Sequence, residues 1–132
     1  MAVQKTKAAL IMEAQAADMT AHQVISLLLE GALERVGQAK YCISSGNTED
    51  KALLFGKIIA IINGLRNSLD LAAGGEIAQN LDGLYDYMAN RVGDAATTEE
   101  YAVMNEIEAL LLEIKCGWDD IAMGQQQEKM TA

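Results

Sequence analysis

The sequence LAAGGEIAQNLDGLYDYM, residues 71–88, decides how this chain folds back on itself. On either side of Gly74 and Gly75, apolar residues recur at three- and four-residue spacing, which predicts two amphipathic helices joined by a turn. The glycine pair lacks the spacing of a phosphate-binding loop and follows a predicted helix instead of a strand, so we expect no nucleotide there. We expect one glycine to close the earlier helix in the left-handed αL conformation and the other to lead into the next helix.

The composition predicts a single all-α domain. The 132 residues are 51% hydrophobic but only 5% aromatic, without proline, a mixture that favours helices. The net charge is −9 and the basic residues are scattered, which opposes binding to nucleic acid or to an anionic membrane surface. No apolar run reaches the roughly 18 residues of a membrane span, and the N-terminal run is too short for an export signal. We therefore expect a cytoplasmic protein without membrane insertion.

Four segments carry the apolar periodicity of amphipathic helices, and short links between them predict an antiparallel four-helix bundle. In the third segment, the spacing assigns Ile77 to the same core-facing stripe as Met88, and Tyr85 to its margin. Thr48 is the expected N-cap of the second segment. The four segments are about 21–45, about 49–73, about 76–93, and a fourth that begins after Thr98.

The two ends of the chain depart from this pattern. Residues 1–19 are rich in Ala and Met with a weak helical pattern, and we expect them to form a mobile N-terminal arm. Residues 124–132 are polar, and we expect a disordered C-terminal tail. The four-helix domain is accordingly predicted over residues 20–123.

The residue types of known catalytic and metal sites do not combine in this sequence. His22 is the single histidine, so a phosphotransfer bundle is one alternative, but the sequence around it offers no lysine to hold a phosphate. The chain has no Glu-x-x-His pair for a di-iron site, and Cys42 and Cys116 lie far apart without zinc-ligand spacing. Asp82 and Asp86 are predicted to lie on a solvated face. We expect no catalytic residue, metal or cofactor, and hence no enzyme.

The stretch SLDLAAGGEIAQNLDGLYDYM, residues 68–88, resembles the junction of the second and third helices in the FliS family of flagellar secretion chaperones. Three weaker matches follow the family order: LLLEGALERVGQAK from Leu27, IINGLRNSL from Ile61 and GWDDIA from Gly117. Together the matches cover about residues 20–122. The chain departs from the family where Leu29 replaces a common tyrosine and where the N-terminal arm lacks tyrosine.

This resemblance implies a cytosolic, non-enzymatic export chaperone. It would bind the disordered C-terminal segment of flagellin, prevent premature polymerisation and support delivery to the flagellar type III export apparatus. The resemblance further implies two other partners, the flagellar export gate protein and the flagellar anti-sigma factor. A generic four-helix adaptor for another secretion substrate is the alternative, and only the identity of the client separates the two.

Apolar residues outside the core stripes suggest grooves for a partner helix, although isolated apolar residues are also common on protein surfaces. Three apolar residues of the arm, Leu10, Ile11 and Met12, are candidates to plug such a groove until the client displaces them. The candidate flagellin-binding residues are Phe55, Ile59, Ile62, Tyr85, Tyr87, Tyr101 and Leu112.

Overall fold

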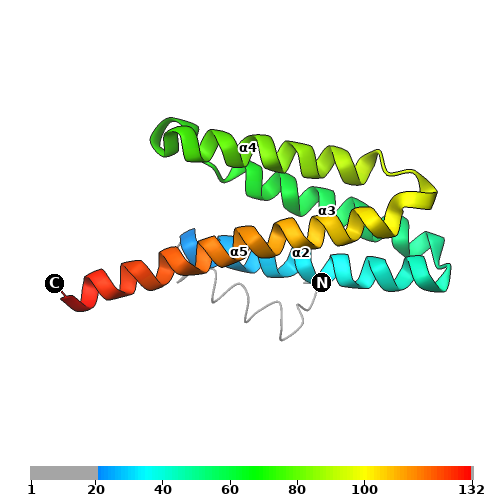
Figure 1. Cartoon of the computed structure of the whole chain (residues 1–132), viewed down its shortest axis with the longest axis horizontal. Coiled ribbons are helices and arrows are strands. Elements are labelled where there is room, and N and C mark those ends of the chain that lie inside the picture. Colours follow the sequence, from blue (N-terminus) through cyan, green and yellow to red (C-terminus); the bar gives the residue numbers. More distant parts are fainter. Residues whose placement is uncertain (1–20, 132) are drawn as a thin grey trace, which may run out of the picture.

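The computed structural model describes the backbone of residues 21–131 and the side chains of residues 22–120, with the exception of residue 73. Every described element is helical, which confirms the predicted all-α fold. The N-terminal arm, including Leu10, Ile11 and Met12, lies outside the described residues. The elements are α2 (Ala21–Ser45), α3 (Thr48–Asn67), α4 (Leu71–Gly93), the short 3-10 helix η1 (Thr97–Glu99) and α5 (Glu100–Thr131) (Figure 1).

Successive helices run back along one another, but the bundle is not equally closed on all sides. α2 packs against both α3 and α5, and α3 packs against α4, whereas α4 contacts α5 far less than it contacts α3. Figure 1 shows α4 and α5 drawing together near η1 and separating toward the start of α4. The four-helix prediction is confirmed, with one side open between α4 and α5.

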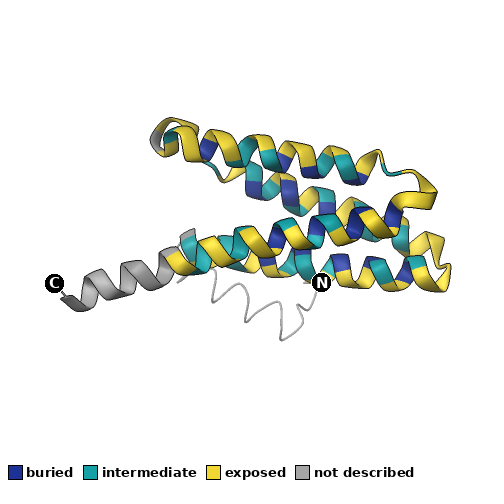
Figure 2. Cartoon of the chain, viewed as in Figure 1, coloured by how far each residue is buried: buried dark blue, intermediate teal, exposed yellow. Residues whose placement is uncertain are grey.

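The core lies between the helices, where the predicted stripes meet (Figure 2). Burial of these side chains supplies the main stabilisation of such a bundle. Removing one large apolar side chain completely from water contributes about 1.5–3 kcal/mol to the free energy of folding. The largest fully buried side chains are Leu29, Val36, Ile58, Ile62, Leu65, Met88, Val92, Val103, Met104, Ile107 and Leu111.

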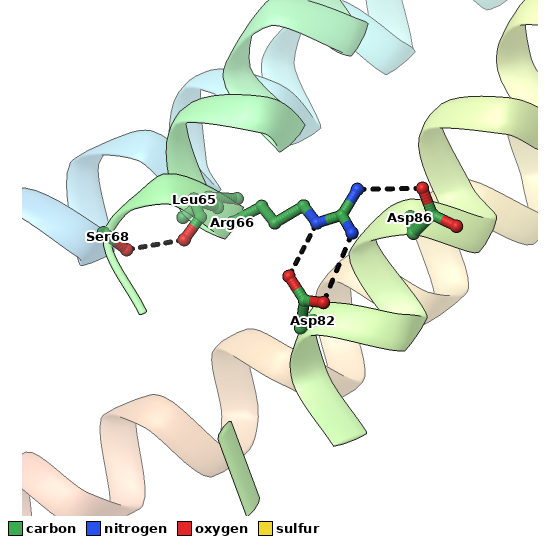
Figure 3. A network of polar contacts seen from close by, with 5 residues as sticks. All are labelled: Leu65, Arg66, Ser68, Asp82 and Asp86. Carbon is green, nitrogen blue, oxygen red and sulfur yellow. Dashed lines mark hydrogen bonds and ion pairs between the residues drawn. The ribbon is translucent and has the colours of Figure 1, made fainter. Parts of the chain in front are cut away.

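The ends of α3 differ from the prediction. Its N-cap is Asn47 and not Thr48, because the Asn47 side chain accepts a hydrogen bond from the Asp50 backbone N–H at 3.2 Å. The helix ends at Asn67, six residues before the predicted end. There the Ser68 hydroxyl donates to the Leu65 carbonyl at 2.6 Å, and its backbone N–H to the Gly64 carbonyl, which closes the last turn (Figure 3).

The glycine pair kinks α4 instead of closing α3, so the predicted αL cap is wrong. Gly75 has φ 57° and ψ −135°, a mirror-image extended conformation that a residue with a Cβ adopts only under strain. A Cβ on Gly74 would lie 2.5 Å from the Cβ of Ala78, so this position also requires glycine. One helical turn therefore precedes the kink, and the regular helix begins after Gly75. Its side chains face directions that the spacing before the kink does not predict.

The kink also overturns the prediction for Ile77. This side chain is 74% exposed, and Ala78 is the buried residue in that turn. At the other end of the chain, helical backbone continues in α5 to Thr131, through most of the segment 124–132 for which the sequence predicts disorder. Side chains beyond Asp120 are outside the described residues.

Candidate functional site

An apolar groove opens where α4 and α5 separate. It encloses about 870 Å³ and is walled by the first turns of α2, the connection from α3 to α4, the kinked start of α4 and the later turns of α5. We call it the α4–α5 groove. Its apolar lining comes from Val24, Ile25, Leu69, Ile77, Leu81, Ile114 and Trp118.

The kink at Gly75 explains why this groove stays open to solvent. Because Ile77 follows the kink by two residues, it stands on the groove wall without being covered by another helix. Val24, on the opposite wall, is 40% exposed. Large apolar side chains that gather around one hollow differ from isolated surface apolar residues, and they make the groove a candidate binding site.

A reciprocal contact between His22 and Trp118 fixes one wall of the groove. The two rings stack with their centroids 4.5 Å apart and their planes within 8°. Trp118 Nε1 donates to the His22 carbonyl at 3.0 Å, and His22 Nε2 lies 2.8 Å from the Trp118 carbonyl, to which it donates. The first turn of α2 is thereby joined to α5, 96 residues later in the chain. His22 thus serves as a structural tie beside the groove.

A charged network joins α3 to α4 beside the groove (Figure 3). The Arg66 guanidinium donates from Nε to Asp82 Oδ1 at 2.6 Å and from Nη2 to Asp82 Oδ2 at 3.2 Å, and from Nη1 to Asp86 at 2.8 Å. The hydrogen bond from Arg66 lowers the pKa of the Asp82 carboxyl below its usual range. These carboxylates are paired with Arg66 on a face that stays partly solvated, as predicted, since the Asp86 side chain is 51% exposed.

A second network holds the C-terminal half of α4 close to α5, beyond the end of the groove at Tyr85. Tyr87 Oη donates to Glu106 Oε2 at 2.6 Å, and Arg91 Nε donates to Glu106 Oε1 at 2.9 Å. Both hydrogen bonds favour the ionised carboxylate and lower the pKa of Glu106. The two helices consequently meet here and diverge only toward the groove.

The predicted partner-binding residues are dispersed over the molecule. Ile62 has no exposed surface and Tyr85 is only 3% exposed, so both belong to the core, although Tyr85 also lines the inner wall of the groove. Phe55 and Ile59 are half-buried against the core on α3. In this conformation none of these four side chains offers a partner much surface.

The other three predicted residues are about half exposed, but they do not share one surface with the groove. The Tyr87 hydroxyl donates a hydrogen bond to Glu106, as described above. Tyr101 lies beneath the Lys40 ammonium, which is 5.4 Å from the ring centroid. Leu112 is 51% exposed on α5. Whether any of the seven contacts a partner stays a prediction.

The groove residues that the sequence analysis missed are Val24, Ile77 and Trp118. Ile77 and Trp118 have the spacing of core residues, and a periodic pattern does not distinguish a helix face that packs inward from one that lines an open groove. The signal for Ile77 was its position two residues after Gly75, since a kink changes the direction in which the next turn faces.

A second cavity of about 720 Å³ lies between α2 and α3 near the turn that connects them. Its lining includes Glu34, Tyr41 and Leu53, and it shares no lining residue with the α4–α5 groove. Leu53 is 65% exposed, which makes it a suitable comparison for Ile77.

Comparison with known proteins identifies the family. The model of the family described as flagellar protein FliS matches residues 4–126. The chain belongs to the FliS family. Among its relatives, the flagellar secretion chaperone FliSB of Pseudomonas aeruginosa is 46% identical over 110 residues, which cover 83% of this chain and 87% of that protein. The flagellar secretion chaperones FliS of Vibrio cholerae and Salmonella typhimurium are each 35% identical, over 83% and 89% of this chain and 80% and 88% of their own lengths.

Membership of the FliS family confirms the resemblance stated from the sequence. The chain is a flagellar secretion chaperone and not an enzyme, which removes the phosphotransfer alternative for His22. Within the described residues, no helix is long and apolar enough to cross a membrane. The open groove, and not a set of reactive side chains, is thus the candidate functional site of this FliS protein.

Proposed function

We propose that this FliS protein binds the C-terminal segment of flagellin in the α4–α5 groove. The observation that supports the proposal most is the exposure of Ile77 on the wall of an 870 Å³ apolar hollow. In this proposal the chaperone acts in the cytoplasm, covers the flagellin segment until export and so prevents premature polymerisation.

The flagellin segment orders as an amphipathic helix when it enters the groove. Helix-in-groove recognition uses apolar residues that recur every three or four positions, and the groove offers apolar side chains from three helices. Ordering a disordered segment costs conformational entropy, so the affinity depends on a few deep apolar contacts more than on the total area covered.

Trp118 provides a direct test because it is the single tryptophan of the chain and lines the groove. A peptide with the sequence of the cognate flagellin C-terminal segment is added while tryptophan emission is recorded, with a scrambled peptide as control. We expect a saturable blue shift, since the client displaces water from the indole. Absence of saturable binding, verified by calorimetry, would overturn the proposal.

The N-terminal arm is proposed to plug the same groove in the free chaperone through Leu10, Ile11 and Met12. The arm enters α2 at Ala21, only three residues before the groove residue Val24, so it is tethered close to the site. A chain that lacks residues 1–19 should bind the flagellin segment more tightly, because it has no internal competitor. Unchanged or weaker binding by the truncated chain would contradict this.

Two further partners, the flagellar export gate protein and the flagellar anti-sigma factor, are part of the proposal on the ground of the family resemblance. A client other than flagellin is the second candidate, since the groove geometry suits any amphipathic helix. Competition between flagellin and another secreted substrate in the Trp118 titration separates the two.

A further inference from the structure

The described charged residues that line the α4–α5 groove are both acidic. Asp70 stands on the connection between α3 and α4, and Glu113 stands on α5, so the two carboxylates belong to different walls. Among the residues that the structure describes, the lining contains neither lysine nor arginine. A mainly apolar groove thus has a carboxylate side chain on each of two walls.

Two cations near these walls, Lys115 and Arg66, pair with carboxylates other than Glu113. Lys115, two residues after Glu113, lies 2.7 Å from Asp119 and 3.9 Å from Glu30. Arg66, near the end of α3, is held by Asp82 and Asp86. Within the described part of the chain, the Glu113 side chain has no hydrogen bond or ion pair. The unpaired Glu113 carboxylate, together with the net charge of −9, favours a cationic partner over an anionic one at the groove.

From this arrangement, and on the basis of the proposed function, we infer that the groove selects a cationic amphipathic helix. The client presents its apolar face to Ile77 and Trp118, and a lysine or arginine beside that face lies against Glu113. The groove wall on α4 runs from Gly74 to Tyr85, which corresponds to roughly three helical turns at about 1.5 Å per residue. Glu113 is therefore a specificity-determining residue, and an acidic helix with the same apolar face is rejected.

A matched pair of charge-neutralising substitutions tests the inference. Glu113→Gln removes one negative charge at the groove, and Glu34→Gln removes one from an exposed position on α2 that lines the other cavity. Binding of the flagellin C-terminal segment is measured at about 0.05 M and about 0.5 M salt, where the Debye length falls from above 10 Å to a few Å. Circular dichroism melts confirm that both variants fold.

We expect Glu113→Gln to weaken binding by about 2- to 5-fold at low salt, as for a partly exposed ion pair, with little difference at high salt. Glu34→Gln should bind like the wild type. Replacing the basic residues of the flagellin segment one at a time by glutamine should abolish the effect of Glu113→Gln for one of them, as in a double-mutant cycle.

The outcomes separate the inference from the proposed function. If the wild type binds but Glu113→Gln binds as tightly, or if both variants are weakened equally, the selection by charge is overturned while the groove proposal stands. If the wild type does not bind the segment at all, the proposed function itself fails.

Discussion

Replacing Ile77 by serine is the sharpest test of where the client binds. In the free chain this side chain is 74% exposed, so the substitution should change the free energy of unfolding by less than about 1 kcal/mol. A client that fills the α4–α5 groove would bury the exposed part. The binding free energy should therefore change more than the free energy of unfolding does.

The size of the effect follows from the exposed fraction. Complete burial of an isoleucine side chain is worth about 1.5–3 kcal/mol. The 74% that remains exposed accounts for about 1.1–2.2 kcal/mol of binding free energy. Since about 1.4 kcal/mol corresponds to a tenfold change, Ile77→Ser should weaken the binding of the flagellin segment by roughly 6- to 40-fold.

Leu53→Ser is the matched control. Leu53 is 65% exposed, but it lies on α3 and lines the separate cavity between α2 and α3. Both variants are titrated with the flagellin segment by calorimetry and by Trp118 emission, and their thermal melts are compared. Binding of Ile77→Ser within twofold of the wild type would refute the assignment of the groove, as would an equal loss in both variants.

Three further predictions concern the scaffold. Gly75→Ala should destabilise the fold by about 1–3 kcal/mol because of the positive φ, whereas Gly83→Ala, at an open helical position, should not destabilise it; equal melting temperatures for the two would contradict this. Leu29→Ala should cost about 2–5 kcal/mol in chemical denaturation, since Leu29 is fully buried, and a loss below 1 kcal/mol would place it outside the core. The Arg66 hydrogen bond lowers the pKa of Asp82 from its ordinary value of 3.8, so its stabilisation is present above that pH and is lost as the pH falls through the lowered pKa. Asp82→Asn should therefore reduce the loss of stability below about pH 4, and an unchanged acid melt would argue against the pair.

Much of the fold was predictable because the information is local. The range of α2 follows from apolar residues at helical spacing, and the structure has the same limits, Ala21–Ser45. The cap of α3 was misplaced by one residue because Thr48 and Asn47 are both good caps, and the choice depends on the turn at Gly46, where φ is 76°.

The candidate site was harder to predict because it depends on residues that are distant in sequence. The sequence predicts that Tyr87 faces outward and contacts a partner. In the structure its hydroxyl instead donates to Glu106 on α5, a contact that the spacing within α4 does not reveal. In the same way, nothing near His22 in the sequence indicates its stacking on Trp118. Side chains with the periodicity of a core were assigned to the core, and the groove they line was missed.

The sequence by itself determined that this chain is helical, that it has four amphipathic segments and that it resembles the FliS family, because periodicity, capping and motifs are properties of neighbouring residues. Only the tertiary structure decided that α4 leaves α5 and exposes Ile77. That outcome depends on the backbone conformation at Gly75 and on which helices pack together, and both are settled only when all four helices are in place.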